Sequence, residues 1–433
     1  MHDFYRHYLD LFARMEHRPY ADILAYQAAL LEKLARHVRL QVPVFADRVR
    51  PLFYGDEFRL KGWRDVPILT RQELRAAAPT LDAITPPAEM GHTRPFSTSG
   101  STGEPVMGRH TAVSSAVITC MRERLFRWHR FDPEKRMAFI FLLGSPEASG
   151  PEGAGGGNWS VLGQNGASHS FELLTSIDRQ IDWLKRVRPD YLATSSSNLH
   201  ELAIAARRAG LDIKIEAGVA VSSRLYPEIR ALAADVFGMR AVEAYGSEET
   251  GFMAVQCDES ELLHVCADHV IVEVVDDDGD PVGRGGSGRV VVTDLHNFAT
   301  PLLRYEIGDL ADTSGTLCPC GRTLPVLRSI AGRVRRSIVF PDGSRINPHM
   351  VIKALQATDL LPTVHYQIVQ TAPDAFQVRY VPERVAVQPD EDSIREKFRI
   401  MVHPDARVSF APVERIERAA NGKFEDFIFF KEN

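Results

Sequence analysis

The stretch that decides the fold is Tyr191-Leu-Ala-Thr-Ser-Ser-Ser-Asn198, followed directly by Leu199-His-Glu-Leu-Ala-Ile-Ala-Ala-Arg-Arg208. A short apolar run is typical of a buried strand, whereas the apolar residues after Asn198 recur at three- and four-residue spacing, as in a helix. The alternation extends in both directions, with predicted helices at 175–187 and 227–237 and predicted strands at 137–143, 213–221 and 241–245. Strands that alternate with helices predict an α/β core with parallel strands.

Polar clusters follow two of these predicted strands. Ser195–Asn198 comes directly after one strand and Gly246–Glu249 after another. Because α/β sheets bind ligands beyond the carboxyl ends of their strands, we expect both clusters to lie near a ligand. The helix before the first cluster is expected to begin with a capping box at Thr175–Asp178.

Three other regions surround this core. Residues 1–90 have the apolar spacing of helices, with a stripe that includes Ile23, Leu31 and Leu34. From His269 onward, short apolar runs between Asp-Gly and glycine-rich turns predict antiparallel strands, and hence a β subdomain. Residues 333–433 read as a small α+β domain, which leaves 1–332 as the large N-terminal domain.

Composition excludes several classes of protein. A net charge of −6 over 433 residues gives no bulk attraction to nucleic acid or to an anionic membrane. The first residues lack the apolar centre of a signal peptide, and the densest apolar run, Met137–Gly144, is too short to span a bilayer. Five cysteines, an odd number, do not suggest a disulfide framework. We therefore expect a cytoplasmic protein with neither nucleic acid nor membrane as a partner.

A loop rich in hydroxyls and glycines lies before the core. Its residues are Ser97, Thr98, Ser99, Gly100, Ser101, Thr102, Gly103, Glu104 and Pro105. Glycines let the backbone approach a ligand, and hydroxyls with free N–H groups can surround a phosphate. The alternative is a flexible Ser/Gly linker, since these residues also dominate ordinary turns. The loop is not a P-loop, and Glu104 stands where a lysine would be sought.

Two later stretches have the side chains of a nucleotide site. Tyr245-Gly246-Ser-Glu-Glu249 joins an aromatic ring to carboxylates, which suits a flat base and a Mg²⁺ ion that also takes phosphate oxygens. Pro301-Leu-Leu-Arg-Tyr-Glu-Ile-Gly-Asp309 ends in an aspartate that can accept from two ribose hydroxyls. The alternatives are solvated acids at a strand end and an ordinary turn aspartate.

Cysteines and a lysine form two further candidates. Cys318-Pro-Cys320-Gly is a tight turn that can place two thiolates on one metal, and Cys257 and His264 precede it. Four such ligands make a closed, structural zinc site, and the alternative is buried free cysteines. Lys423, on an Asn-Gly turn, is either an exposed surface lysine or a point charge that a moving domain carries into a distant site.

In this order, the loop and the four stretches resemble the adenylate-forming enzymes, specifically the phenylacetate–CoA ligase group with its capsule-biosynthesis relatives. The resemblance runs from about Phe96 to the end of the chain and includes Cys318-Pro-Cys-Gly-Arg322 followed by Ile330-Ala-Gly-Arg333. It implies a large adenylation domain with a small mobile C-terminal domain. It also implies that ATP activates a carboxylic acid to an acyl-adenylate with release of pyrophosphate, and that coenzyme A then accepts the acyl group.

The resemblance assigns roles to individual residues. The loop would bind the ATP phosphates, Tyr245 would line the adenine, and Asp309 would bind the ribose. Glu249 would hold Mg²⁺, Arg333 would lie near the ribose and phosphate, and Lys423 would stabilise charge as the adenylate forms. Gly246 and Arg304 belong to the same motifs and are included in the nucleotide site. Some relatives bind zinc at positions matching Cys257, His264, Cys318 and Cys320. Cys266 would then not be a zinc ligand.

The acid and its acceptor are defined less sharply. An aromatic or small acyl acid is expected in a pocket that includes Asn158, Trp159, Ser195, Ala217 and Gly218. Relatives have two acids soon after the Gly-Arg at the hinge, where this chain has Arg335-Arg336. That reversal leaves open an amine or an acyl carrier protein as acceptor. A protein that holds nucleotide without turnover is the alternative outside enzymes.

Overall fold

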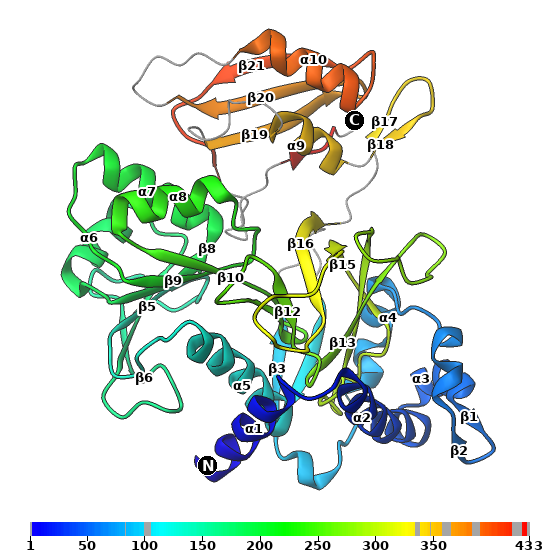
Figure 1. The fold of residues 1–433 in the computed structure, drawn as a ribbon. Coiled ribbons are helices and arrows are strands. Elements are labelled where there is room, and N and C mark those ends of the chain that lie inside the picture. Colours follow the sequence, from blue (N-terminus) through cyan, green and yellow to red (C-terminus); the bar gives the residue numbers. More distant parts are fainter. Residues whose placement is uncertain are drawn as a thin grey trace. The chain divides into compact units, whose positions relative to one another are not determined.

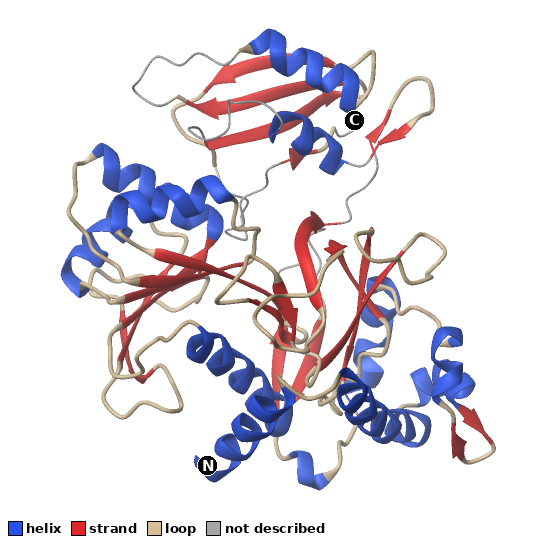
Figure 2. Ribbon diagram, in the orientation of Figure 1, coloured by secondary structure: helices blue, strands red, loops and turns tan. Residues whose placement is uncertain are grey.

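The computed structural model describes residues 2–82, 84–98, 105–333, 338–346, 348–356, 365–382, 390–417 and 427–430. The chain forms two compact units. The first comprises Met1–Glu134, Asn158–Asn165 and Glu243–Val334, and the second comprises Lys135–Gly157, Gly166–Val242 and Arg335–Asn433. Helices and strands alternate through much of the chain (Figure 1, Figure 2), so the predicted α/β class is confirmed.

The first unit begins with helices, as expected for residues 1–90. They are α1 (His2–Met15), α2 (Tyr20–Gln41), α3 (Pro43–Ala46) and α4 (Arg71–Asp82), with 3₁₀ helices η1 (Asp47–Leu52), η2 (Leu60–Asp65) and η3 (Ala88–Met90). The hairpin β1 (Phe53–Tyr54) and β2 (Glu57–Phe58) interrupts them. Ile23, Leu31 and Leu34 of the predicted stripe are fully buried. Within the described residues, no helix combines the length and the apolar character needed to cross a membrane.

The rest of the first unit is mostly antiparallel. This was predicted for the strands after His269, whereas the antiparallel strands between residues 240 and 265 precede that region. A separate hairpin, β3 (Thr93–Ser97) with β4 (Met107–Thr111), leads into α5 (Ala112–Trp128). The sheet strands, in spatial order, are β13 (Val270–Val275), β14 (Ser287–Asp294), β15 (Tyr305–Thr313), β16 (Val326–Arg333), β12 (Leu263–Val265) and β11 (Gly251–Gln256). Strand β10 (Arg240–Ser247) pairs antiparallel with β11.

The second unit contains the predicted parallel strands. Its sheet strands are β9 (Ala217–Val221), β8 (Tyr191–Ser195), β5 (Met137–Phe141), β7 (Ala167–Glu172) and β6 (Ala154–Asn158). Strand β5 pairs in parallel with β7 and β8, and β8 pairs in parallel with β9. Helices α6 (Ile177–Val187), α7 (Ser196–Arg208) and α8 (Pro227–Phe237) contribute to one hydrophobic cluster with these strands.

Two helix starts in this unit differ from the prediction. Ser176, and not Thr175, caps α6, because its hydroxyl accepts from the Arg179 backbone N–H. Helix α7 begins at Ser196, so Ser195 is its cap and the polar cluster belongs to the first turn of the helix. In both cases adjacent residues carry hydroxyls that are suited to cap the helix, so the sequence pattern alone does not indicate which hydroxyl accepts from the backbone N–H.

The C-terminal residues have a sheet and a core of their own. The sheet strands are β21 (Arg407–Pro412), β20 (Ala375–Val381), β19 (His365–Ala372) and β22 (Phe427–Ile428), beside the hairpin β17 (Ile338–Val339) and β18 (Arg345–Ile346). Helices α9 (Pro348–Gln356) and α10 (Glu391–Met401) share a hydrophobic cluster with them. This agrees with the predicted α+β character; the boundary at residues 332 and 333 stays a prediction.

Candidate functional site

Two of the predicted nucleotide residues lie in direct contact in the first unit. The Tyr245 hydroxyl, at the end of β10, donates to Asp309 Oδ2 of β15 over 2.8 Å. Both side chains are buried, with 8% of each residue exposed. Residues predicted to meet the base and the ribose therefore come together across 64 positions of sequence.

An arginine that the sequence did not indicate connects two more of these residues. Arg71 Nη2 donates to Thr98 Oγ1 over 2.7 Å, at the start of the predicted phosphate loop. Its Nη1 lies 3.5 Å from Glu249 Oε1 and 3.5 Å from the Tyr305 hydroxyl. Among the described residues its buried Nε has no hydrogen-bond partner. A guanidinium next to the predicted phosphate loop, with an N–H that no described residue accepts, is suited to an anionic ligand.

The backbone explains why Arg71 lies there. Leu69 bridges to β15 as a single strand residue, donating to the Arg304 carbonyl (2.8 Å) and accepting from the Glu306 N–H (2.9 Å). Thr70 and Glu73 then form the cap of α4, with Glu73 N–H donating to the Thr70 hydroxyl (3.2 Å). Arg71 is thus the first helical residue, one step beyond a segment fixed against β15.

Glu249 is held in the turn between β10 and β11. The residue is 3% exposed, and the turn closes with Thr250 N–H donating to the Ser247 hydroxyl (3.3 Å). Gly251 has φ +68°, and a Cβ there would lie 2.5 Å from Ile118 of α5. A left-handed backbone pressed against a helix permits glycine alone. Burial, followed by the nearby charge of Glu249, raises the pKa of Tyr305, which stays a neutral phenol.

Other predicted nucleotide residues can be placed only in part. Ser97 is exposed at the end of β3, whereas Ser99, Gly100, Ser101, Thr102, Gly103, Glu104, Arg335, Arg336 and Lys423 lie outside the described residues. The backbone of Arg333 pairs with Asp309 in the register of β15 and β16. Gly246 meets the Gly251 carbonyl so closely that a Cβ would lie 2.4 Å from its oxygen. Gly246 therefore serves the close approach of the two strands.

Arg304 requires a correction. It is 3% exposed, and its guanidinium donates to Glu273 Oε2 (3.2 Å) and to the carbonyls of Val66 (2.9 Å) and Gly279 (3.2 Å). Through these hydrogen bonds Arg304 connects the end of η2 with β13 and with the turn between β13 and β14. A guanidinium used in this way is committed to the fold, so we assign Arg304 a structural role in place of the predicted nucleotide contact.

The predicted pocket residues divide between the units. Asn158 and Trp159 belong to the first, where Trp159 is 4% exposed and its ring meets Phe126 edge-on at 4.8 Å. Asn158 Nδ2 donates to the Gly163 carbonyl over 2.8 Å. The other three residues, in the second unit, are Ser195, which caps α7, and Ala217 and Gly218, which are buried in β9. Their common pocket stays a prediction.

The four predicted metal ligands gather in the first unit. The ligand atoms of Cys257, His264, Cys318 and Cys320 all lie within 4.8 Å of one another. Cys318 Sγ is 3.5 Å from Cys257 Sγ, and Cys320 Sγ is 3.3 Å from His264 Nε2. Tetrahedral zinc with Zn–S bonds of about 2.3 Å separates its sulfurs by about 3.8 Å. The donor set therefore has the dimensions of a closed zinc site.

The surroundings of this cluster suit a metal. His264 Nδ1 lies 3.3 Å from the Leu324 carbonyl, which can only accept, so Nε2 is left free of hydrogen and turned toward the cysteines. Burial lowers the pKa of His264 to about 4, which favours the neutral, ligating imidazole. Burial also raises the pKa of Cys257 to about 12, so that a thiolate there requires a cation.

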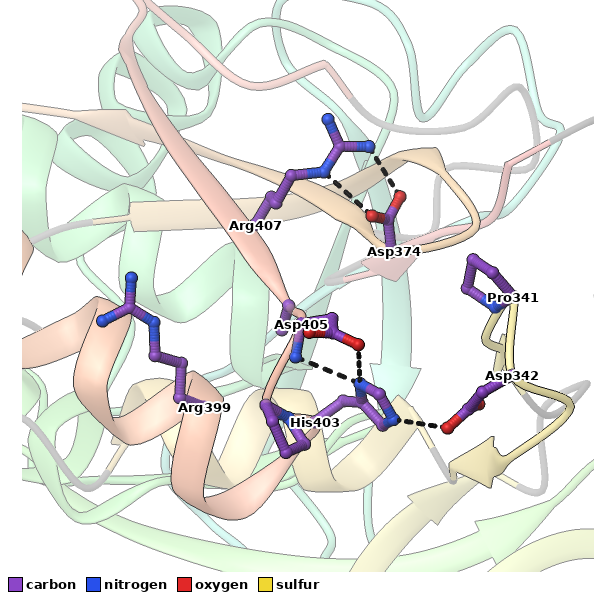
Figure 3. A pocket seen from close by; sticks show the side chains of 9 residues that line it. Pro341, Asp342, Asp374, Arg399, His403, Asp405 and Arg407 are labelled. Atoms are coloured by element: carbon purple, nitrogen blue, oxygen red, sulfur yellow. Dashed lines mark hydrogen bonds and ion pairs between the residues drawn. The ribbon is translucent and has the colours of Figure 1, made fainter.

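A cavity of about 500 Å³ lies in the C-terminal part of the chain (Figure 3). The charged side chains around it are largely paired with one another: Arg407 binds Asp374 through two hydrogen bonds of 2.9 and 2.6 Å, and His403 Nε2 lies 3.0 Å from Asp342. Hydrogen bonds from Ser344, then from His403, lower the pKa of Asp342 to about 2. None of the predicted site residues that the structure describes lines this cavity.

Comparison with known proteins agrees with these motifs. No family model matches the chain. A phenylacetate-coenzyme A ligase of Thermus thermophilus is 27% identical over 366 residues, covering 82% of this chain and 80% of that protein. A phenylacetate-coenzyme A ligase of Escherichia coli is 26% identical over 337 residues, covering 74% of each chain. A crystal structure of 2-hydroxyisobutyryl-CoA ligase in the postadenylation state shares the fold, with a TM-score of 0.75 at 19% identity over 97% of this chain and 92% of that chain.

Proposed function

Because this chain belongs to the phenylacetate–CoA ligase-like group of adenylate-forming enzymes, we propose that it activates a carboxylic acid with ATP and then transfers the acyl group to coenzyme A. The first step would form an acyl-adenylate and release pyrophosphate. The relatives named above act on phenylacetate or 2-hydroxyisobutyrate as their names state, and for this chain we propose an aromatic or small acyl acid.

One observation carries the proposal. Within one unit, two groups of side chains are in contact: Arg71 binds Thr98 and lies 3.5 Å from Glu249, and Tyr245 donates to Asp309. They include a base-sized ring, an acid for ribose hydroxyls, a cation whose Nε has no partner among the residues that the structure describes, and a buried carboxylate. Such a set matches the parts of a nucleotide better than it matches an uncharged ligand.

The proposed roles follow from this chemistry. Tyr245 and Asp309 bind the nucleoside, while Thr98, with the loop after it, and Arg71 bind the phosphates. Glu249 holds Mg²⁺, which when bound neutralises charge on the phosphate oxygens. Arg333 and Lys423 are proposed to act near the α-phosphate, as the resemblance implies.

The test is ATP–pyrophosphate exchange across a panel of aryl and short acyl acids. We expect at least one acid to support exchange well above the rate without acid, because a reversible adenylate returns labelled pyrophosphate to ATP. Adding coenzyme A should then yield a thioester. Turnover with an amine or a carrier-protein thiol in its place would fit the Arg335-Arg336 hinge and revise the acceptor alone. Absence of exchange across the panel would contradict the proposed function.

We also propose that Cys257, His264, Cys318 and Cys320 bind one structural zinc ion. Metal analysis of the purified protein should find about one zinc per chain, and Cys320→Ser should lose it together with thermal stability. At a free zinc concentration 1,000 times Kd, zinc binding adds about 4 kcal/mol to the free energy of unfolding. Cys266→Ser is the matched control, since this buried thiol is outside the cluster and its loss should leave zinc bound. A metal-free protein of full stability would refute the site.

A further inference from the structure

Two buried histidines approach the turn that carries Glu249. His110 Nε2 lies 2.8 Å from the Glu248 carbonyl, and His269 Nε2 lies 2.7 Å from the Thr250 carbonyl. His110 comes from β4, and His269 lies just before β13. The carbonyls on either side of Glu249 are therefore each held by an imidazole, and each imidazole belongs to a different part of the unit.

The protonation of both rings is fixed by their partners. A carbonyl oxygen only accepts, so Nε2 of each ring must carry the hydrogen and donate it. His110 is 3% exposed and His269 is fully buried, and this burial lowers the pKa of His110 and brings that of His269 to about 4. Each ring is thus neutral, with Nδ1 left as an acceptor.

His110 also connects this turn to the predicted phosphate loop. Its ring packs on Phe96 of β3 at 4.6 Å, one residue before Ser97. Asn297 Nδ2 lies 3.5 Å from His110 Nδ1 and donates to the neighbouring Arg109 carbonyl over 3.0 Å. A displacement of the β3–β4 hairpin is therefore coupled to the turn through this buried ring, in addition to the contacts of Arg71.

The surroundings of His269 argue against a role in stability alone. Its Nδ1 and Asp294 Oδ2 are both buried without a hydrogen-bond partner among the described residues, and Nδ1 lies 3.9 Å from Asp294 Oδ1. An unpaired polar atom in a buried position lowers stability, and an apolar side chain of similar size in place of His269 would remove the unpaired Nδ1. What an apolar residue could not supply is the N–H that reaches the Thr250 carbonyl.

We propose that His110 and His269 are positioning residues that fix the Glu248–Thr250 turn, so that Glu249 is held where it can bind the metal of a metal–nucleotide complex. The proposal rests on the proposed function for the identity of that ligand. The restraint itself is a property of the protein alone, so it can be measured without nucleotide.

The experiment compares His110→Leu and His269→Leu with His110→Gln and His269→Gln, since a Gln amide can present an N–H near the position of Nε2. In the full-length, nucleotide-free protein, hydrogen exchange by mass spectrometry over residues 245–252 should be about tenfold faster in the leucine variants. The Kd for MgATP should rise about tenfold, the effect of losing one buried hydrogen bond. Both quantities should return to within about threefold of wild type in the glutamine variants.

The matched control is His129→Leu. His129 is also buried and lies 2.9 Å from a backbone carbonyl, that of Gln256, at the other end of β11. We expect this change to lower the melting temperature while leaving the Kd for MgATP unchanged. If a leucine variant does not fold, His269→Asn, whose amide ends one bond short of the carbonyl, takes its place against His269→Gln.

The outcomes separate the two proposals. Leucine variants that change the melting temperature without changing exchange at 245–252, or glutamine variants that restore neither quantity, would overturn the positioning role. A wild-type protein that binds no MgATP but shows the expected exchange pattern would overturn the proposed function and leave the restraint standing.

Discussion

Glu249→Gln should lower the rate of ATP–pyrophosphate exchange by about 10²- to 10³-fold. A metal ion placed at developing negative charge contributes several kcal/mol to the transition state, and each 1.36 kcal/mol is a factor of ten in rate. Glutamine keeps the volume of the side chain but removes the charge that attracts Mg²⁺. The Mg²⁺ concentration needed for half-maximal rate should rise as well.

The structure makes this substitution specific. Glu249 is 3% exposed, and its two described side-chain contacts, to Arg71 and Tyr305, are long at 3.5 Å. Losing them should cost little stability, so the melting temperature should change far less than the rate. Glu89→Gln, which removes the same charge from an exposed position of the same unit, is the control and should retain wild-type rates. A Glu249→Gln rate within threefold of wild type would remove Glu249 from the proposed metal site.

Arg124→Met should destabilise the first unit by about 3–5 kcal/mol, because it leaves the buried Asp268 carboxylate without the cation that binds it and removes one of the cations of Glu16. Arg124 is 1% exposed and donates to Asp268 Oδ1 over 2.9 Å and to Glu16 Oε1 over 3.1 Å, with a second, shorter bond to Asp268 Oδ2. Burial disfavours its charge, but the charge and hydrogen bonds of Asp268 outweigh burial and raise the pKa of Arg124.

The control for this prediction is Arg127→Met. Arg127 binds the same Glu16 carboxylate but is 43% exposed, so its loss should cost less than about 1 kcal/mol. Urea midpoints and melting temperatures of the two variants are to be compared. Adding Glu16→Gln and Asp268→Asn to Arg124→Met should recover part of the loss, because the uncompensated charges are then gone. Equal stability of Arg124→Met and Arg127→Met would contradict the conclusion that the buried Arg124 pair is the one that stabilises the unit.

Much of the fold was predictable because it depends on local patterns. The alternation around Tyr191 predicted the parallel strands, and the helical stretch predicted at 227–237 has the same bounds as α8. For the Cys/His cluster, the spacing of the residues left a zinc site and buried free cysteines as alternatives, and the resemblance favoured the zinc site. Helix starts such as Ser176 were not, since adjacent hydroxyl residues compete for the same backbone N–H groups.

What the sequence could not indicate depends on contacts between distant segments. Arg71 follows an ordinary helix cap, and only the pairing of Leu69 with β15 brings it to Glu249 and Thr98. Arg304 lies within a motif of the nucleotide site, yet its guanidinium is bound by Glu273 and by backbone carbonyls. A sequence pattern identifies a motif, but it does not indicate which of the motif's side chains contact the ligand and which stabilise the fold.

The cap of α4 bears on how variants of this protein should be scored. Thr70 and Glu73 are exposed, and substitutions there would rank as mild in a screen for abundance or thermal resistance. Both residues nevertheless set the direction in which the first helical side chain, Arg71, leaves the backbone. A screen for turnover would therefore rank the same two surface positions among the sensitive ones. Positions that differ between the two screens would be those that affect the site without contacting the ligand.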